Sequence, residues 1–188
     1  ADVLLFTRLA ADLMGPTKMD RPEDVEPNLV NGKVYAALTN NSNRGKPELP
    51  VDEANPIGSS MVRASLSAPL TSASGNRNGY VLEMTPTGGH ETNVFTWDLM
   101  LVCGDPAAAE TYFGGVDKST VSPISCPDNV AFDSDGQLWI STDGNVLGSN
   151  DGIFRVPTSG PLRGQVRQFV TMPRGAEACG PLIADRNR

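Results

Sequence analysis

The sequence predicts an all-β protein that forms part of a β-propeller, with about two four-stranded blades, the start of a third, and one short N-terminal helix. Three observations support this fold class: frequent hairpin-type turns, short strand-like runs beside those turns, and an internal repeat. The chain of 188 residues contains 19 Gly and 15 Pro, which interrupt helices and mark turns. This composition favours short strands over long helices.

The N-terminal segment, residues 1–15, is predicted to be the helix. Its leucines recur every four positions, at Leu5, Leu9 and Leu13. This spacing places them on one face of a helix. Asp2 can cap the first turn, and Gly15-Pro16 is a typical stop signal.

Turn chemistry predicts the strands that follow. Asn-Gly or Asp-Gly pairs occur at 31–32, 78–79, 135–136, 143–144 and 151–152. These residues tolerate the positive φ values that tight hairpins require. Each pair lies beside runs rich in β-branched, aromatic and other apolar residues, which are typical of strands. The predicted strands are 33–39, 80–84, 94–102, 130–133, 137–142, 153–156 and 165–172.

An internal repeat indicates the propeller. Segments of the first half match segments of the second half in the same order: 22–25 with 127–130, 32–35 with 136–139, and 78–84 with 151–156. Residues 183–185 resemble 131–133, so a third copy begins near the end of the sequence. A repeat of about 50 residues that holds four strands has the size of a propeller blade. The alternative interpretation is a small twisted β-sheet protein with a coincidental repeat.

The repeat divides residues 1–188, taken as one partial propeller domain, into blades. The first blade covers 21–103, the second 125–173, and the third starts at 177–188. The first blade carries an insertion over 41–77 that is rich in Asn, Ser, Gly and Pro, and loops of this length are often functional. Because propellers close with four to eight blades, we expect further N-terminal and C-terminal blades to complete the ring.

Composition argues against several function classes. The net charge of -7 disfavours a nucleic-acid partner, since binding phosphates requires Lys and Arg. The longest apolar stretch, Val94–Cys103, is too short to span a bilayer. With His90 as the single histidine, zinc sites built on His pairs are disfavoured and a Ser-His-Asp site would depend on that residue alone.

The cysteine count is odd, with Cys103, Cys126 and Cys179. At most one disulfide can therefore form, and one thiol is left over. We expect each cysteine to be a small core residue or part of a disulfide rather than a nucleophile.

Polar residues gather where each innermost strand is predicted to begin. They are Arg21, Glu23 and Asp24 in the first blade, Asp128 and Asn129 in the second, and Arg174 and Glu177 in the third. In a propeller these strands line the channel, so their starts face one mouth. Carboxylate and amide oxygens that converge without His suit Ca²⁺, and carboxylate sites also take iron or manganese. The arginines beside them can hold a planar or tetrahedral anion through paired hydrogen bonds.

The alternative interpretation of these polar residues is that they cap turns or solvate the ends of loops. We expect that simpler role for Asp143 and Asp151, which lie in Asp-Gly pairs.

Several segments together resemble the PhoX-type alkaline phosphatase family. They are 7–12 (TRLAAD), 19–24 (MDRPED), 34–41 (VYAALTNN), 95–98 (FTWD), 103–106 (CGDP), 125–132 (SCPDNVAF), 138–144 (LWISTDG) and 173–181 (PRGAEACGP). The likeness covers nearly the whole chain in the right order and is interrupted mainly by the insertion.

This resemblance implies a secreted or periplasmic enzyme that hydrolyses small phosphate monoesters on a β-propeller. It also implies a Ca²⁺- and Fe³⁺-containing cluster on the channel axis. By position, Arg21 resembles a phosphate-binding arginine, and Arg174 is a second candidate for that role. The implied metal ligands are Glu23, Asp128, Asn129 and Glu177, and the resemblance suggests no other cofactor.

The family also carries N-terminal blades, with further metal ligands and a cysteine motif, that match nothing in this sequence. We therefore expect the chain by itself to bind metal weakly and to be inactive or nearly so. Two other functions remain open: a Ca²⁺-binding hydrolase of the gluconolactonase or strictosidine synthase type, and a non-catalytic propeller interaction module. The motifs at 20–24 (DRPED) and 174–177 (RGAE) favour the phosphatase.

Overall fold

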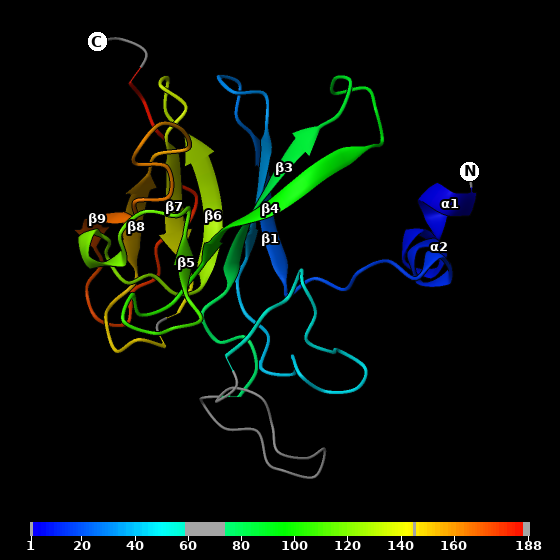
Figure 1. The fold of residues 1–188 in the computed structure, drawn as a ribbon, viewed down its shortest axis with the longest axis horizontal. Coiled ribbons are helices and arrows are strands. Elements are labelled where there is room, and N and C mark those ends of the chain that lie inside the picture. The colour runs from blue at the N-terminus through cyan, green and yellow to red at the C-terminus, as the bar shows by residue number, and fades with distance from the viewer. Residues whose placement is uncertain (1, 59–73, 145, 186–188) are drawn as a thin grey trace.

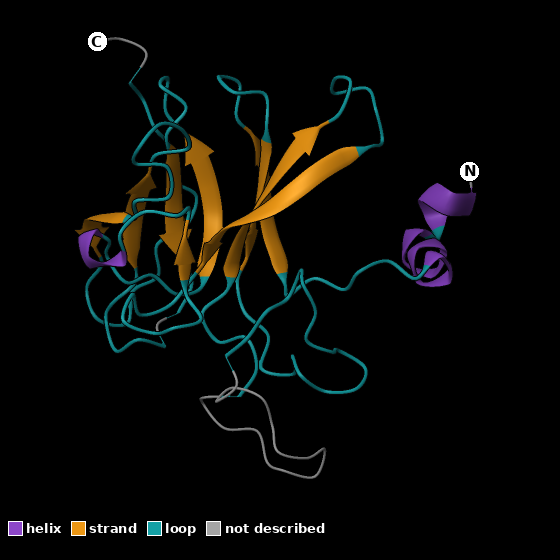
Figure 2. Ribbon diagram, viewed as in Figure 1, coloured by secondary structure: helices purple, strands orange, loops and turns teal. Residues whose placement is uncertain are grey.

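The computed structural model describes residues 2–58, 74–144 and 146–185 and folds into two antiparallel sheets (Figures 1 and 2). The first sheet contains, in order, β1 (Pro22–Pro27), β2 (Val34–Leu38), β3 (Tyr80–Pro86), β4 (Phe95–Val102) and β5 (Tyr112–Phe113). The second contains, in order, β6 (Pro127–Phe132), β7 (Leu138–Thr142), β8 (Gly152–Val156) and β9 (Arg167–Thr171). The prediction of a mainly β protein is confirmed.

Helix is confined to short segments in the described residues: α1 (Asp2–Leu5), α2 (Thr7–Met14) and the 3-10 turn η2 (Lys118–Thr120). The segment predicted as one helix therefore forms two, separated at Phe6. α2 ends at Gly15, which adopts a left-handed φ of 60° and donates its N–H to the carbonyl of Asp12. None of the residues of α1 or α2 is buried, and Figure 1 shows both helices apart from the sheets.

Both sheets are built to the same pattern. Each is an up-and-down arrangement of four antiparallel strands, to which the first sheet adds β5. The register shifts at matching places, after Pro22 and Pro127 in the first strand pair and after Val81 and Ile153 in the third. Because a bulge bends a strand and increases its twist, we expect the two sheets to bend at matching places.

The hydrophobic core lies between the two sheets. Alternate residues of each strand point to the same face of a sheet, so one face of each sheet is apolar and buried. The first sheet contributes Tyr35, Ala37, Val81 and Leu101, and the second contributes Val130, Leu138, Ile140, Phe154 and Val156. Their burial fixes how the two sheets face each other.

The first strands of the two sheets, β1 and β6, lie side by side. The N–H of Val130 on β6 donates to the carboxylate of Asp24 on β1, over 2.9 Å. At the beginning of β6, the hydroxyl of Thr39 donates to the carbonyl of Pro127, over 2.8 Å. Both strands therefore begin at the same edge of the molecule.

The predicted insertion at 41–77 follows β2, and its residues 59–73 lie outside the described part of the chain. Arg44 anchors the described part because its guanidinium binds the buried carboxylate of Asp20, at 2.7 Å from Nη2 to Oδ1. Nη1 of the same side chain donates to the carbonyl of Pro50. The insertion is thus tied to the residue directly before Arg21.

The three cysteines are free: Cys103 and Cys126 are buried and Cys179 is exposed. None of the described helices has the length and apolar character needed to cross a membrane.

Candidate functional site

The starts of β1 and β6 and the ends of β2 and β7 meet at one edge of the molecule. The carbonyl of Arg21, before β1, accepts the N–H of Thr39, after β2, over 3.1 Å. The carbonyl of Cys126, before β6, accepts the N–H of Asp143, after β7, over 3.0 Å. The two sheets thus repeat one backbone arrangement, and its side chains come together.

The backbone is strained at the same two positions. Arg21 and Cys126 have φ values of 51° and 54°, and no other described residue except glycine has a positive φ. A side chain in this conformation costs about 1–2 kcal/mol. Such strain persists only where surrounding contacts enforce it, and it is frequent at functional sites.

The guanidinium of Arg21 makes three contacts. Nη2 lies 2.8 Å from Oε1 of Glu23 and 4.0 Å from Oδ2 of Asp143. Nη1 donates to Oδ1 of Asn40 over 3.3 Å. The side chain remains 50% exposed, and a guanidinium has five N–H donors in a planar fork. Arg21 can therefore donate to an incoming anion while it keeps these contacts.

Asp128, on β6, is the most perturbed carboxylate of this edge. Its pKa is raised to about 6, first by burial and then by the negative charges of Glu23, Asp143 and Glu177, in that order. The positive charge of Arg21 acts in the opposite direction. The charges that act on Asp128 therefore place Arg21, Glu23, Asp128 and Glu177 in one electrostatic neighbourhood.

Two predicted site residues lie differently. Oδ1 of Asn129 accepts the N–H of Gly180 over 2.8 Å and the hydroxyl of Ser141 over 3.4 Å, so that oxygen already links β6 to the C-terminal segment. Arg174 is exposed and makes no hydrogen bond or ion pair with the described residues.

The chemistry of the donors suits a hard cation, since carboxylate oxygens are the ligands that Ca²⁺ and similar ions prefer. Across residues 2–58, 74–144 and 146–185, however, no group of three or more His, Cys, Asp or Glu is arranged to hold a metal ion. Carboxylates are therefore concentrated at this edge, but the described residues do not supply a complete set of metal ligands.

Sequence reasoning missed Asn40 and assigned Asp143 to a turn. Both follow the second strand of a sheet, directly beside the start of the first strand. The internal repeat held a partial signal for them, because strand pairing matches Asp143 to Thr39, the residue directly before Asn40.

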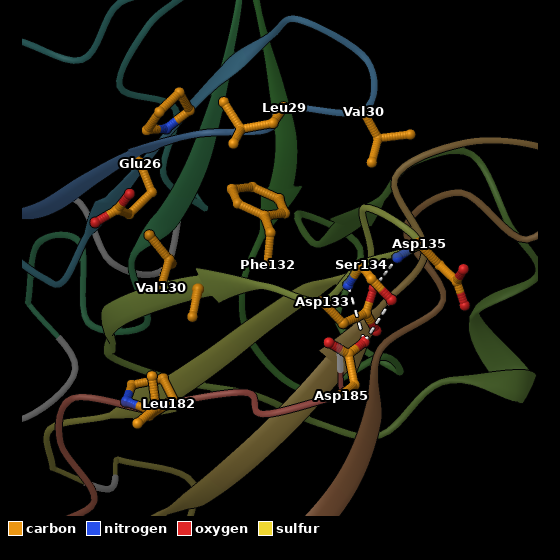
Figure 3. A pocket seen from close by; sticks show the side chains of 13 residues that line it. Glu26, Leu29, Val30, Val130, Phe132, Asp133, Ser134, Asp135, Leu182 and Asp185 are labelled. Carbon is orange, nitrogen blue, oxygen red and sulfur yellow. Dashed lines mark hydrogen bonds between the residues drawn. The ribbon is translucent and has the colours of Figure 1, made fainter. Parts of the chain in front are cut away.

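A cavity of about 890 Å³ lies at the other ends of β1 and β6 (Figure 3). Its apolar lining includes Leu29, Val30 and Phe132. Its polar lining includes Asp135 and Asp185, and the carboxylate of Asp185 accepts the hydroxyl of Ser134 over 2.8 Å. None of the described residues that line it is Lys, Arg or His, whereas the edge at Arg21 offers a half-exposed guanidinium, so that edge remains the candidate site.

Comparisons with known proteins agree with the resemblance seen in the sequence. The model of a family described as "Alkaline phosphatase PhoX" matches residues 1–188. Among solved structures, the chain is similar to "Pseudomonas fluorescens PhoX in complex with vanadate, a transition state analogue", with 33% sequence identity and a TM-score of 0.68. The match covers 93% of this chain and 29% of that one, so the chain spans less than a third of the relative's length. A comparison with curated proteins gave no match.

Proposed function

Because the chain belongs to the alkaline phosphatase PhoX family, we propose that it provides the phosphate-binding arginine and part of the metal site of a phosphomonoester hydrolase. The substrate would be a small phosphate ester. The observation that carries this proposal is the contact of half-exposed Arg21 with Glu23, beside the perturbed carboxylate of Asp128.

In the proposed site, Arg21 orients the phosphoryl group through two parallel hydrogen bonds from its guanidinium. Its ion pair with Glu23, at 2.8 Å, limits the directions in which the planar group can point. Because that ion pair uses one edge of the guanidinium, the phosphoryl oxygens would bind to the remaining N–H groups.

The negative charge of the site explains why the proposal includes bound cations. A phosphate ester is an anion, and the carboxylates of Glu23, Asp128, Asp143 and Glu177 would repel it. Ca²⁺ and Fe³⁺, which the family resemblance implies, would offset that repulsion and polarise the phosphoryl oxygens. Glu23, Asp128 and Glu177 would hold the cations together with ligands from other parts of the enzyme. Asn129 is the weakest candidate, because its side-chain oxygen already accepts the N–H of Gly180.

The two sheets, in this proposal, are blades of a propeller. The C-terminal segment extends beside β6, where the N–H of Gly180 donates to Asn129 and the N–H of Ser134 donates to Asp185. Asp24 on β1 accepts the N–H of Val130 on β6, so β1 is linked to β6 as β6 is linked to the C-terminal segment. These side-chain links from one first strand to the next support a third blade that begins at the C-terminal segment.

The face of the first sheet that points away from the second sheet is evidence for a further blade packed against it. Three of its residues correspond by strand pairing to core residues of the second sheet: Val25 to Val130, Ala36 to Ile140, and Leu82 to Phe154. An apolar pocket of about 300 Å³ lies on this outer face. A neighbouring blade would cover this outer face, just as the first sheet covers the apolar face of the second sheet. The resemblance further suggests a periplasmic or secreted enzyme.

A chimera tests this function. The 188 residues would replace the matching 29% of the Pseudomonas fluorescens protein, and hydrolysis of p-nitrophenyl phosphate would be measured with Ca²⁺ and Fe³⁺ supplied. We expect activity in the chimera and a loss of at least about 100-fold with Arg21→Ala, the size seen when a donor to developing charge is removed. An active Arg21→Ala chimera would contradict the role of Arg21.

The chain alone provides the complementary test. We expect no measurable hydrolysis of p-nitrophenyl phosphate by the 188 residues under the same conditions, because the ligand set is incomplete. Robust turnover by the chain alone would show that it contains the whole active site and would overturn this part of the proposal.

A further inference from the structure

A side-chain relay leads from Cys126 to the proposed phosphate-binding arginine. Nδ2 of Asn40 lies 3.5 Å from Sγ of Cys126, and Oδ1 of Asn40 lies 3.3 Å from Nη1 of Arg21. We propose that Asn40 is a positioning residue that holds the guanidinium of Arg21, and that Cys126 fixes the orientation of the Asn40 amide. The inference rests on the proposed function only where it assigns a purpose to this positioning.

Donor and acceptor chemistry determines how the amide points. A guanidinium carries only donors, so the amide oxygen of Asn40 must face Arg21. The amide nitrogen then faces Cys126, whose sulfur can accept a hydrogen bond. That sulfur in turn donates its S–H toward the carbonyl of Arg77, over 3.6 Å. Reversal of the amide would place N–H groups against the guanidinium and lose the contact with Arg21, and the S–H of Cys126 could reach the reversed amide oxygen only by leaving the carbonyl of Arg77.

Cys126 is a rigid support because its backbone is held on both sides. Its N–H donates to the carbonyl of Asn78 over 2.7 Å, and its carbonyl accepts the N–H of Asp143 over 3.0 Å. The residue is 2% exposed. Arg21 has no such enclosure, since its side chain is 50% exposed. The relay therefore connects an exposed, charged side chain to a fixed, buried one.

The surroundings of Cys126 suit a support and not a nucleophile. The residue is buried, and its sulfur already contacts the amide of Asn40 and the carbonyl of Arg77. A cysteine nucleophile needs the opposite, an accessible sulfur that is free to react. A neutral thiol can accept from Asn40 and donate to Arg77 at the same time.

The internal repeat explains why these two residues face each other. Arg21 and Cys126 occupy matching positions, each before the proline that begins the first strand of its sheet, and each with a positive φ. Asn40 leaves the end of β2 between them. The first sheet thus presents the functional side chain, and the corresponding residue of the second sheet supports it.

The test measures the rotation of the Arg21 guanidinium about its Cζ–Nε bond by ¹⁵N nuclear magnetic resonance in the 188-residue chain. In Asn40→Ala, we expect rotation to be roughly fivefold faster, the factor expected from the loss of one ordinary hydrogen bond. In Asn40→Asp, which keeps an oxygen toward Arg21, we expect rotation no faster than in the unaltered chain. Asn150→Ala, at an exposed position, is the matched control and should leave the rate unchanged.

Cys126 is tested by a conservative pair. Cys126→Ser keeps a group that accepts from Asn40 and donates to Arg77, so it should retain slow rotation. Cys126→Ala keeps neither and should speed rotation about twofold or more. Equal rates in both variants would overturn the role of Cys126, and an unchanged rate in Asn40→Ala would overturn the role of Asn40.

Thermal unfolding of each variant identifies any that fail to fold. In that case Asn40→Asp and Cys126→Ser still decide the question, because faster rotation in either one contradicts the relay.

Binding of inorganic phosphate to the chimera described above separates this inference from the proposed function. If Asn40→Ala speeds the rotation of Arg21 and weakens phosphate binding, both the relay and the phosphate role of Arg21 are supported. If rotation is faster but phosphate affinity is unchanged, the relay stands and the purpose assigned to it in phosphate binding is overturned, whereas the phosphate role of Arg21 itself is decided by Arg21→Ala.

Discussion

Arg44 and Asp20 form a fully enclosed ion pair, with Nη2 2.7 Å from Oδ1 and side chains that are 1% and 0% exposed. Asn41 and Asn76 donate to the same carboxylate, and Nη2 of Arg44 also donates to the carbonyl of Lys18. This network joins the described part of the insertion to the segment that enters β1. It therefore determines the path of the chain just before Arg21.

Replacing one member of this pair should be strongly destabilising. In Arg44→Met, the carboxylate of Asp20 remains buried without its counter-charge, and breaking such a pair typically costs about 3–5 kcal/mol. Urea unfolding measures the change in the free energy of unfolding. Arg167→Met, at an exposed residue of β9, is the control and should change stability by less than about 0.5 kcal/mol. A loss below about 1 kcal/mol in Arg44→Met would contradict the structural importance of the pair.

Asp128 should make stability depend on pH in a specific direction. Its pKa is raised from 3.8 to about 6 in the folded chain, so the folded state binds a proton more tightly than the unfolded state does. The stabilisation is complete below about pH 4 and is lost as pH rises through about 6. Asp128→Asn, which carries no charge at any pH, should remove this decrease.

Carboxyl ¹³C shifts measure the pKa of Asp128 directly, and thermal midpoints at pH 4.5 and 7.5 measure its effect on stability. Glu23→Gln should lower the pKa of Asp128, because Glu23 is the carboxylate that raises it most. An Asp128 that titrates near pH 4 in the unaltered chain would disprove the clustering of charge at this edge.

Glu83 should have the opposite pH dependence. Its carboxylate is 1% exposed and lies 2.7 Å from Nζ of Lys33 and 3.1 Å from Nη2 of Arg163, and it accepts the hydroxyl of Tyr35 over 2.7 Å. Burial raises the pKa of Glu83, but these partners together lower it below 4.5. The stabilisation is therefore present above pH 4.5 and is lost as pH falls through the lower pKa of the folded state.

In Glu83→Gln, both cations lose their ionic partner, so we expect a loss of about 1.5–3 kcal/mol at pH 7, the range for hydrogen bonds to charged groups. The loss should shrink as pH falls below about 4. Chemical unfolding at pH 7 and pH 3.5 gives both values. A loss that does not change with pH would show that packing, and not charge, explains the effect.

Gly79 should tolerate no side chain. Its φ is +82°, and a Cβ there would collide with the carbonyl oxygens of Leu38 and Thr39. Gly160 has a similar φ of +73° but open space around a Cβ, so the two positions share the backbone strain and differ only in the collision. We expect Gly160→Ala to cost about 1–2 kcal/mol and Gly79→Ala to cost at least about 2 kcal/mol more, because backbone atoms must move. Equal unfolding free energies for the two variants would contradict the close approach of β2 at Gly79.

The local part of the fold was predictable from the sequence. Hairpins depend on residues that tolerate positive φ, and strands depend on runs whose side chains fit a sheet, so both can be identified within a few residues. The matching register shifts after Pro22 and Pro127 are in line with the repeat seen between 22–25 and 127–130. Helix at the N-terminus was predictable for the same reason, although it forms two short helices whose leucines are exposed.

The candidate site was predictable only in part. Arg21, Glu23, Asp128 and Glu177 could be selected because they lie near the predicted starts of first strands and carry the chemistry for anions and cations. The roles of Asn129 and Asp143 could not be assigned, because each depends on a partner more than 50 residues away, Gly180 for one and Arg21 for the other.

The sequence by itself determined the class of fold, the turns, the repeat and the types of residue at the edge where β1 and β6 begin. Only the tertiary structure decided which of those residues converge. Asn40 meets Arg21 and Cys126 because two sheets far apart in sequence pack through one core. Hydrogen bonds and charge interactions act over a few ångström, whereas sequence patterns record neighbours along the chain, so convergence between sheets becomes visible only when their packing is known.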